Sequence, residues 1–446
     1  MRSPHSSAFV AARHFATGAG AVAIALPTLF AGSVPASPAI VSHVVTPAVA
    51  SGVRYQFTGN ATDGKVLFHC QTGARLGPPA PPFCYGPDQI RAAYDIQPVL
   101  SSGITGAGRT IVIIDAFQSP TIRQDLALFD HIWGYPDPRF KITAPYGLTP
   151  FNPGDPAQLL WSSEISVDVE WSHAIAPGAT IDLVLAKSDS DSDVLRATSF
   201  AVDHNLGDVI SQSFGEAEAC AAPALLAQEH RVFEAATRKG ITLFASSGDF
   251  GSAEPTCDGS SLVKSASTPA SDPNVTGVGG THLLADSSSG AYRSESVWHD
   301  DYGAGGGGYS TVYRRPGYQA PFQSNAKQRG VPDVAYNADV RGGVIVAFGV
   351  PLGVGGLFVF GGTSAGAPQW AGIIALADQK GGHRLGAINP RLYQIARSDA
   401  YHTALHDVTA GNNGFLGMPG FAAGPGWDAA TGLGTPDAAH LIALLT

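Results

Sequence analysis

Four short strand-like runs recur along the middle of the chain, each long enough for a buried strand, and the first of them is β-branched throughout. They cover residues 110–114, 180–186, 208–213 and 241–246. Segments with helical periodicity lie near them, at about 120–134, 190–204 and 224–238. Strands alternating with helices of this length predict βαβ units and a mainly parallel sheet. Because ligands bind such sheets at the carboxyl ends of the strands, the candidate chemistry is expected there.

The N-terminal part of the chain has a different pattern. Residues 1–39 have a basic start, an apolar centre and small residues at the end, which is typical of an export signal. Pro27 and the shortness of the apolar run argue against a membrane anchor, and no later stretch is apolar for long enough to span a bilayer. Residues 40–84 are expected to form a short irregular segment, for which a reduced propeptide is one interpretation, before a main domain over residues 85–446. We therefore expect a secreted protein.

The composition argues against a disordered chain and against a nucleic-acid-binding protein. The chain has 446 residues, of which 44% are hydrophobic, enough for a large packed core rather than a disordered chain. Lys and Arg together number 26 against 36 Asp and Glu, and no long basic run exists, so binding to nucleic-acid phosphates is not expected. Charged residues make up only 14%, against roughly 25% in ordinary globular proteins. A surface of uncharged polar side chains changes its charge little when the pH falls.

The four cysteines favour disulfides, because their number is even and the chain is expected to be exported. Four cysteines allow three connectivities, of which Cys70 with Cys84 and Cys220 with Cys257 is the most plausible. No spacing typical of a zinc site is present, so structural zinc is not expected.

The strongest chemical candidate is Ser364, within the run Gly-Thr-Ser-Ala-Gly at residues 362–366. A short apolar run, residues 357–360, precedes it, and a helix is expected to begin directly after Ser364. The hydroxyl would then lie at the positive end of a helix dipole. Taken alone, the serine could equally serve only as a helix cap. A nucleophilic serine needs a base nearby.

Two serine-hydrolase classes compete for this motif. The run also fits G-x-S-x-G of the α/β-hydrolases, for which His402, His406 and Asp407 would be the partners. The remaining chain after Ser364, however, offers helices and glycine-rich turns rather than further strands. A subtilisin-like order fits the late serine better and places the acidic residue Asp115 at the end of the first strand. Such an enzyme also needs a histidine, and none occurs in a His-Gly-Thr setting.

The sequence offers acidic residues in place of that histidine. Glu164 and Asp168 are four residues apart, so they share one face of a predicted helix. Two adjacent carboxyls cannot both ionise easily, and one keeps its proton to higher pH. Glu170 is expected to turn away toward the surface. Asp249 follows the strand 241–246, and the glycine-rich stretch 299–310 is expected to be a surface loop beside a site.

Seven sequence blocks together resemble the sedolisin family, serine-carboxyl peptidases that share the subtilisin fold. The resemblance extends from about residue 85 to the C-terminus. It implies an α/β, subtilisin-like three-layer fold with a mainly parallel central sheet and helices on both faces. The blocks run in family order: Glu164-x-x-x-Asp168, residues 211–215 (SQSFG), residues 247–249 (SGD), residues 278–281 (VGGT), residues 331–334 (VPDV), residues 362–365 (GTSA) and residues 424–428 (GPGWD).

This resemblance implies a role for each candidate. Ser364 would be the nucleophile, Glu164 the base, Asp168 the acid that orients it, and Asp249 the oxyanion partner. Residues Ser213, Phe214 and Gly215 would bind substrate. Because glutamate is a weak base at neutral pH and only a protonated Asp249 can donate a hydrogen bond, the enzyme should work in acid. We expect a secreted, monomeric endopeptidase with protein or peptide substrates. The alternative function is that of a binding protein: a catalytically silent relative that binds peptides.

The C-terminal part suggests a metal site. Two aspartates, Asp407 and Asp428, flank glycine-rich backbone, and a hard cation needs such carboxylate and carbonyl oxygens. Taken alone, this pattern is more often an ordinary turn. The resemblance implies one structural calcium ion, with the side chains of Asp407 and Asp428 and the carbonyls of Val408, Gly424 and Gly426 as ligands.

Overall fold

The computed structural model describes several stretches of the N-terminal part and nearly all of the chain from Cys84 onward. The export signal expected over residues 1–39 lies outside the described residues. In the described part of the chain, no helix is both long and apolar enough to cross a bilayer. The described residues are 43–47, 60–62, 65–67, 70–71, 84–286, 288–323, 326–350 and 356–446.

The core of the molecule is an eight-stranded sheet. All of its strand pairs are parallel except the edge pair β14–β15. The four runs predicted to be buried strands are β5, β7, β8 and β10, side by side at its centre, so the predicted parallel sheet is confirmed. In spatial order the strands are β15 (Tyr292–Val297), β14 (Thr276–Ala285), β10 (Thr242–Ser246), β8 (Val209–Gln212), β5 (Thr110–Ala116), β7 (Thr180–Ala186) and β6 (Arg139–Thr143), with β18 (Val334–Asn337) paired to β14.

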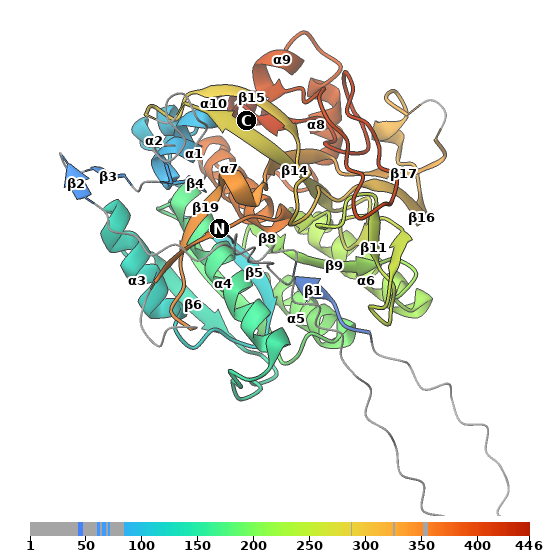
Figure 1. Cartoon of the computed structure of the whole chain (residues 1–446), viewed down its shortest axis with the longest axis horizontal. Helices are drawn as coiled ribbons and strands as arrows, with labels where there is room; N and C mark the ends of the chain where they lie inside the picture. The colour runs from blue at the N-terminus through green and yellow to red at the C-terminus, as the bar shows by residue number, and fades with distance from the viewer. Residues whose placement is uncertain are drawn as a thin grey trace, which may run out of the picture.

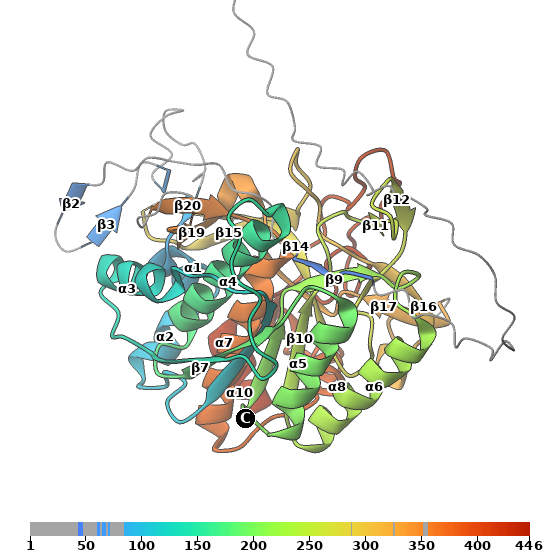
Figure 2. The ribbon, with the colours of Figure 1, turned by 90° about the horizontal axis from the view of Figure 1, so that it is seen from below.

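Helices cover both faces of this sheet and form the outer two of three layers (Figure 1). Figure 2 shows α5 and α6 on one side of the strands and α4 and α7 on the other. The helices expected near residues 120–134, 190–204 and 224–238 are present with ends shifted by at most two residues. These are α3 (Ile122–Trp133), α5 (Asp191–Asp203) and α6 (Pro223–Arg238), while α4 (Pro156–Ile175), α7 (Gly366–Gly381) and α10 (Ala438–Leu445) complete the layers.

Helix α4 lies inside the molecule, and every residue from 161 to 175 is buried. Its start is set by Asp155, whose carboxylate accepts the backbone N–H of Ala157 at 3.0 Å. The expectation that Glu170 faces the surface is wrong: its side chain is 0% exposed, and Oε2 accepts the N–H of Ala347 at 2.9 Å. The reason is that α4 packs against the sheet on one side and against α3 and the strand ending at Ala347 on others, so beyond its first turn no face of it meets water.

Shorter helices and strands lie around the central sheet and its covering helices. The sequence after the glycine-rich turn at residues 362–366 contains only two-residue strands, β21 and β22, among the described residues. This agrees with the expectation that no further strand–helix units follow Ser364. The remaining elements are α1 (Pro87–Ala93), α2 (Gln97–Ser101), α8 (Asn389–Ile395), α9 (Tyr401–Ala404), β2 (Asn60–Thr62), β3 (Lys65–Leu67), β4 (Cys84–Tyr85), β11 (Ala253–Pro255), β12 (Leu262–Lys264), β16 (Gly308–Arg314), β17 (Gln328–Val331), β19 (Gly343–Ala347), β20 (Leu357–Phe360), β21 (Leu405–His406), β22 (Thr435–Pro436) and three 3₁₀ turns at Gly317–Gln319, Val340–Gly342 and Thr363–Ala365.

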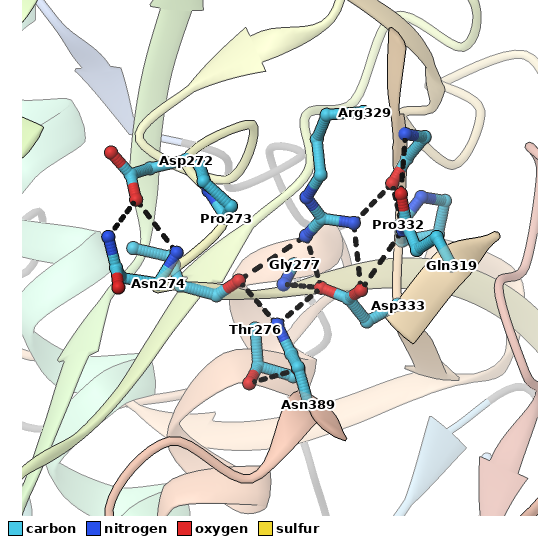
Figure 3. A network of polar contacts seen from close by, with 12 residues as sticks. Asp272, Pro273, Asn274, Thr276, Gly277, Gln319, Arg329, Pro332, Asp333 and Asn389 are labelled. Atoms are coloured by element: carbon cyan, nitrogen blue, oxygen red, sulfur yellow. Dashed lines mark hydrogen bonds and ion pairs between the residues drawn. The ribbon is translucent and has the colours of Figure 1, made fainter. Parts of the chain in front are cut away.

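A buried ion pair joins β17, β18, β14 and α8 at one end of the sheet (Figure 3). Both side chains, Arg329 and Asp333, are fully buried, and they form two N–H to oxygen bonds of 2.8 and 2.5 Å. Asp333 also accepts the backbone N–H of Gly277 at 2.9 Å and the hydroxyl of Tyr393 at 3.0 Å. Because the Asp333 carboxylate accepts all of these hydrogen bonds, its negative charge is compensated although it is buried. This explains why an aspartate occupies the third position of the block at residues 331–334.

The segment before the main domain is not wholly irregular, contrary to the sequence expectation. Thr46–Pro47 forms strand β1, which pairs antiparallel with β9 (Phe214–Ala217), and β9 pairs in turn with β13 (Ser267–Thr268). The structure contains both expected disulfides. Their Cα–Cα distances are 5.3 Å for Cys70–Cys84 and 5.2 Å for Cys220–Cys257.

Candidate active site

Ser364 occupies a sharp connection between β20 and α7. The helix does not begin directly after Ser364 as expected: one 3₁₀ turn, Thr363–Ala365, comes first, and α7 starts at Gly366. Gly362 has φ of +104°, a backbone conformation that side chains with a Cβ rarely adopt, so a glycine is needed before the serine. The Ser364 side chain is buried, and its hydroxyl donates to the carbonyl oxygen of Ser213 at 3.3 Å.

Three carboxyl groups gather beside Ser364, and each is 0% exposed. Glu164 and Asp168 come from one face of α4, as their spacing predicted, and Asp115 comes from β5. Asp168 Oδ1 accepts the hydroxyl of Ser213 at 2.7 Å. The oxygens of Asp115 accept no hydrogen bond from any described residue. The sequence pattern indicates Asp115 as the acidic residue of a subtilisin-like order but does not connect it with the carboxyl pair, although its position at the end of a central strand is a usable signal.

Burial is the main cause that raises the pKa of all three carboxyls well above their usual range. Repulsion by Asp168 and Asp115 raises the pKa of Glu164 further, while an interaction with the Ser364 hydroxyl lowers it in part. The hydrogen bond from the Ser213 hydroxyl lowers the pKa of Asp168 in part. The cluster therefore holds protons that isolated surface acids would lose.

Asp249 lies just beyond β10 and is tied to the serine turn. Its Oδ1 accepts both the backbone N–H and the hydroxyl of Thr363, each at 2.8 Å, and Thr363 directly precedes Ser364. Oδ2 has no partner among the described residues. Burial is the largest cause that raises the pKa of Asp249 to about 7, and the two bonds from Thr363 oppose it. In acid this carboxyl is protonated and can donate a hydrogen bond.

The glycine-rich stretch 299–310 does lie beside this site, but most of it is not at the surface as expected. Residues 303–308 are buried because they pack on the loop that carries Asp249. Gly306 N–H donates to the carbonyl of Gly248 at 2.7 Å, and a Cβ on Gly306 would lie 2.0 Å from the carbonyl oxygen of Ser247. Only glycine permits this close approach. Residues 303–308 therefore pack against the loop that carries Asp249 and fix its position.

The histidines nominated for the α/β-hydrolase alternative show no such arrangement. The ring of His406 stacks on Tyr292 with centroids 3.9 Å apart, and His402 is exposed. The side chain whose pKa is affected by the Ser364 hydroxyl is a carboxyl group, that of Glu164. Ser364 also follows β20, which pairs with β19 outside the central sheet, whereas the α/β-hydrolase nucleophile stands at the end of a strand of the central sheet.

The two C-terminal segments expected to form a metal site meet in the structure. Asp407 Oδ2 accepts the N–H of Gly426 at 2.9 Å, and Asp428 Oδ2 accepts the N–H of Gly424 at 3.0 Å. The other oxygen of Asp407, Oδ1, is buried without a hydrogen-bond partner among the described residues. A buried carboxylate oxygen without a partner is costly, and a hard cation would compensate it. The donor set therefore fits a calcium ion.

The fold and this serine turn define the chain as a subtilase, and residues 163–396 match the family described as Peptidase_S8, subtilase family. A solved structure of Pseudomonas sedolisin, a serine-carboxyl proteinase complexed with two molecules of pseudo-iodotyrostatin, superimposes with a TM-score of 0.71. It is 32% identical, and the match covers 80% of this chain and 97% of that chain. Within the subtilases, this chain belongs to the sedolisin family.

Curated relatives agree with this assignment. Kumamolisin of Bacillus sp. (strain MN-32) is 35% identical over 381 residues, which are 82% of this chain and 64% of the relative. Sedolisin of Pseudomonas sp. (strain 101) is 33% identical over 378 residues, 81% of this chain and 61% of the relative. Mouse tripeptidyl-peptidase 1 is 34% identical over 271 residues, 54% of this chain and 44% of the relative. The chain thus spans less than two thirds of the length of these relatives.

Proposed function

We propose that this protein is a secreted, acid-active serine-carboxyl endopeptidase that hydrolyses peptide bonds in proteins or peptides. The observation that carries the proposal is the arrangement around Ser364. Its turn is hydrogen-bonded to Asp249, whose pKa is raised to about 7, and it faces the buried carboxyls Glu164 and Asp168 instead of a histidine. Membership of the sedolisin family supports the same reaction.

The chemistry follows from these positions. Ser364 Oγ attacks the carbonyl carbon of the peptide bond, and Glu164 accepts its proton while Asp168 holds Glu164 in place. To do this the hydroxyl turns from the carbonyl of Ser213 toward Glu164. Protonated Asp249 donates to the oxyanion, and Glu164 then returns the proton to the leaving amine. Water then attacks the acyl carbon while Glu164 takes its proton, the bond from that carbon to Ser364 Oγ breaks, and Glu164 returns the proton to Oγ as the carboxylic acid leaves.

The pKa values set the direction of the pH dependence. Ionised Asp249 has no proton to donate, so oxyanion stabilisation is lost as the pH rises through about 7. The raised pKa of Glu164 and Asp168 keeps one proton in the pair over the same acid range. We expect turnover to be greatest in acid and to fall toward neutral pH.

The two disulfides support the proposed secreted location. Export through residues 1–39 would deliver it to an oxidising compartment, where Cys70–Cys84 and Cys220–Cys257 are stable. Residues 85–446 would be the peptidase domain and residues 40–84 a short segment before it. Peptide substrates would bind as an extended strand beside Ser213, Phe214 and Gly215, and the enzyme would act as a monomer.

A structural calcium ion completes the proposal. Asp407 Oδ1 and Asp428 would supply negative charge, and the carbonyls of Val408, Gly424 and Gly426 would complete the oxygen shell. The ion would fix the C-terminal loops to each other. None of these ligands belongs to the catalytic set, so the ion would stabilise the fold rather than take part in bond cleavage.

The test is a set of variants assayed on casein at about pH 4, with folding checked by circular dichroism. Ser364→Ala and Glu164→Gln should each abolish turnover, since each removes part of one catalytic unit. Asp249→Asn should lower it severely. Glu170→Gln is the matched control: it is a buried glutamate on the same helix but bonds Ala347 instead. Near wild-type rates in Glu164→Gln would contradict the proposal. A chain that binds peptides without cleaving them would be the catalytically silent relative.

A further inference from the structure

Asp300 closes a turn at the start of the glycine-rich stretch, shortly after β15. Its Oδ1 accepts the backbone N–H groups of Tyr302 at 2.6 Å and Gly303 at 3.1 Å. The backbone that follows this turn is bonded to the loop of the oxyanion partner, because the N–H of Ala304 donates to the carbonyl of Asp249 at 3.0 Å. The turn closed by Asp300 therefore helps to fix where the backbone of Asp249 lies.

Asp339 belongs to a second segment, which holds the serine turn. The carbonyl of the preceding residue, Ala338, accepts the N–H of Gly362 at 2.7 Å, and Gly362 is two residues before Ser364. Asp339 itself is only 5% exposed, and its Oδ1 accepts the N–H of Arg341 at 2.7 Å. The position of Asp339 is therefore tied to the turn that presents the candidate nucleophile.

The carboxyl groups of Asp300 and Asp339 meet between these two segments. Each is a side-chain hydrogen-bond partner of the other. Oδ2 of Asp300 is buried and accepts no bond from an N–H or hydroxyl in the described part of the chain, which leaves this oxygen for the contact with Asp339. Two ionised carboxylates cannot bond each other, because neither has a hydrogen to donate. The contact is therefore a hydrogen bond only while one of the two carboxyls holds a proton.

The surroundings decide which carboxyl holds that proton. Burial raises the pKa of Asp300 to about 6, and the hydrogen bond with Asp339 and repulsion by its charge add to this. Asp339 Oδ2 also forms an ion pair with Nδ1 of His282. Burial acts to raise the pKa of Asp339, but the hydrogen bonds with His282 and Asp300 outweigh it and lower the pKa overall. Asp300 is therefore the proton donor and Asp339 the acceptor. The other titratable or charged groups around them are Asp249, Glu295, Tyr85 and the exposed pair of Asp301 and Arg341.

We propose that Asp300 is a positioning residue: protonated, it donates to Asp339 and holds the loop of Asp249 and the turn of Ser364 at the spacing that the oxyanion needs. This inference rests on the proposed function, because it takes Asp249 and Ser364 as groups that act together on the substrate carbonyl. When Asp300 ionises, two carboxylates face each other and repel, so the two segments are no longer joined there. Turnover is therefore lost in two steps as the pH rises, first as Asp300 ionises at about 6 and then as Asp249 ionises at about 7.

Asp300→Ala and Asp300→Asn test this role through kcat and KM on a fluorogenic peptide. Asp300→Ala loses both the turn and the contact, so at pH about 4 its kcat should fall about ten-fold while KM stays within about two-fold. In Asp300→Asn the amide oxygen can still accept the two N–H groups of the turn, and the NH₂ group donates to Asp339 at every pH. This variant should therefore recover most of the turnover that Asp300→Ala loses.

The pH profile distinguishes positioning from other effects of Asp300. The upper midpoint of kcat should move from about pH 6 in wild type to about pH 7 in Asp300→Asn, so at pH about 6.5 the variant should be about four-fold faster relative to its own maximum. Asp301→Asn, at the 84% exposed neighbour, is the matched control and should keep the wild-type profile. Repulsion by Asp300 raises the pKa of Asp249, so an effect of its charge on Asp249 alone would lower the midpoint in Asp300→Asn. An equal or lower midpoint in this variant would overturn the proposal.

Urea unfolding in a Ser364→Ala background separates this inference from the proposed function. Because the pKa of Asp300 is raised by folding, its contribution to stability is fully present below about pH 4 and is lost as the pH rises through about 6. The urea midpoint of Asp300→Asn should therefore gain on that of the parent between pH 4 and pH 6 and keep a constant difference above pH 7, while Asp301→Asn follows the parent. A difference that is constant at every pH would refute the shared proton.

The two measurements together assign each failure to one of the two proposals. Cleavage by wild type with the same pH profile in Asp300→Asn would refute the positioning role and leave the peptidase intact. No cleavage by any chain, with a urea midpoint difference that still changes below pH 6, would refute the peptidase and retain the proton-dependent contact between the two segments.

Discussion

The buried carboxyls make the fold itself sensitive to neutral pH, and this can be measured apart from catalysis. Glu254 of β11 is 4% exposed, and burial is the main cause that raises its pKa to about 8, with repulsion by Asp249 adding to it. The pKa of Asp249 is raised to about 7. The folded chain therefore holds these protons more tightly than the unfolded chain does. Their contribution is fully favourable below about pH 4 and is lost as the pH rises through about 7 to 8.

The size of the effect follows from the shifts. One pKa unit corresponds to about 1.36 kcal/mol, so a shift from 3.8 to about 7 for Asp249 amounts to roughly 4 kcal/mol above that pH. For Glu254, from 4.5 to about 8, the figure is roughly 5 kcal/mol. The two groups repel each other, so their shifts overlap and the joint loss is smaller than the sum. A typical domain has only about 5–15 kcal/mol of stability in total, so this loss is large.

Glu254→Gln isolates one part of this loss. Urea unfolding at half-unit steps from pH 4 to pH 8, in a Ser364→Ala background to prevent self-digestion, gives the free energy of unfolding at each pH. The parent should lose several kcal/mol over this range, and Glu254→Gln should lose roughly 3–5 kcal/mol less. Glu234→Gln, at a glutamate whose side chain is 46% exposed, should follow the parent. A free energy of unfolding that stays flat or rises between pH 4 and pH 8, or parallel curves for parent and Glu254→Gln, would refute the reasoning.

Three further outcomes concern stability. A chelator at the pH of maximal activity should lower the melting temperature by mass action, Asp407→Ala should reproduce that shift, and an unchanged melting temperature in both would contradict a calcium site. Replacing Cys220 and Cys257 together by serine should cost about 2–4 kcal/mol in urea unfolding, and free thiols at both positions in a non-reducing peptide map would show that no bridge forms. Asp333→Asn leaves Arg329 as an uncompensated buried charge and should cost about 3–5 kcal/mol, whereas Asp301→Asn, at an 84% exposed partner of Arg341, should cost less than about 1 kcal/mol; equal costs would refute the argument.

The sequence by itself determined the central strands and the helices that cover them. The run at residues 111–114 is apolar at every position, so a strand buried on both faces satisfies it. That Glu164 and Asp168 share one face of a helix likewise follows from local helix geometry alone, because they are four residues apart. These features depend on residues close together in the chain, and pattern analysis recovers them.

Tertiary structure decided the features that depend on what packs against each element. Glu170 follows the same helix rules as its neighbours, yet it is buried because β19, distant in sequence, covers that side of α4. The stretch 303–308 is buried because the loop carrying Asp249 packs against it. Asp115 joins the carboxyl cluster, and residues 43–47 pair with β9, through contacts between segments far apart along the chain. Local periodicity records whether a residue can face a core, but only the closed fold determines which core and which partner it meets.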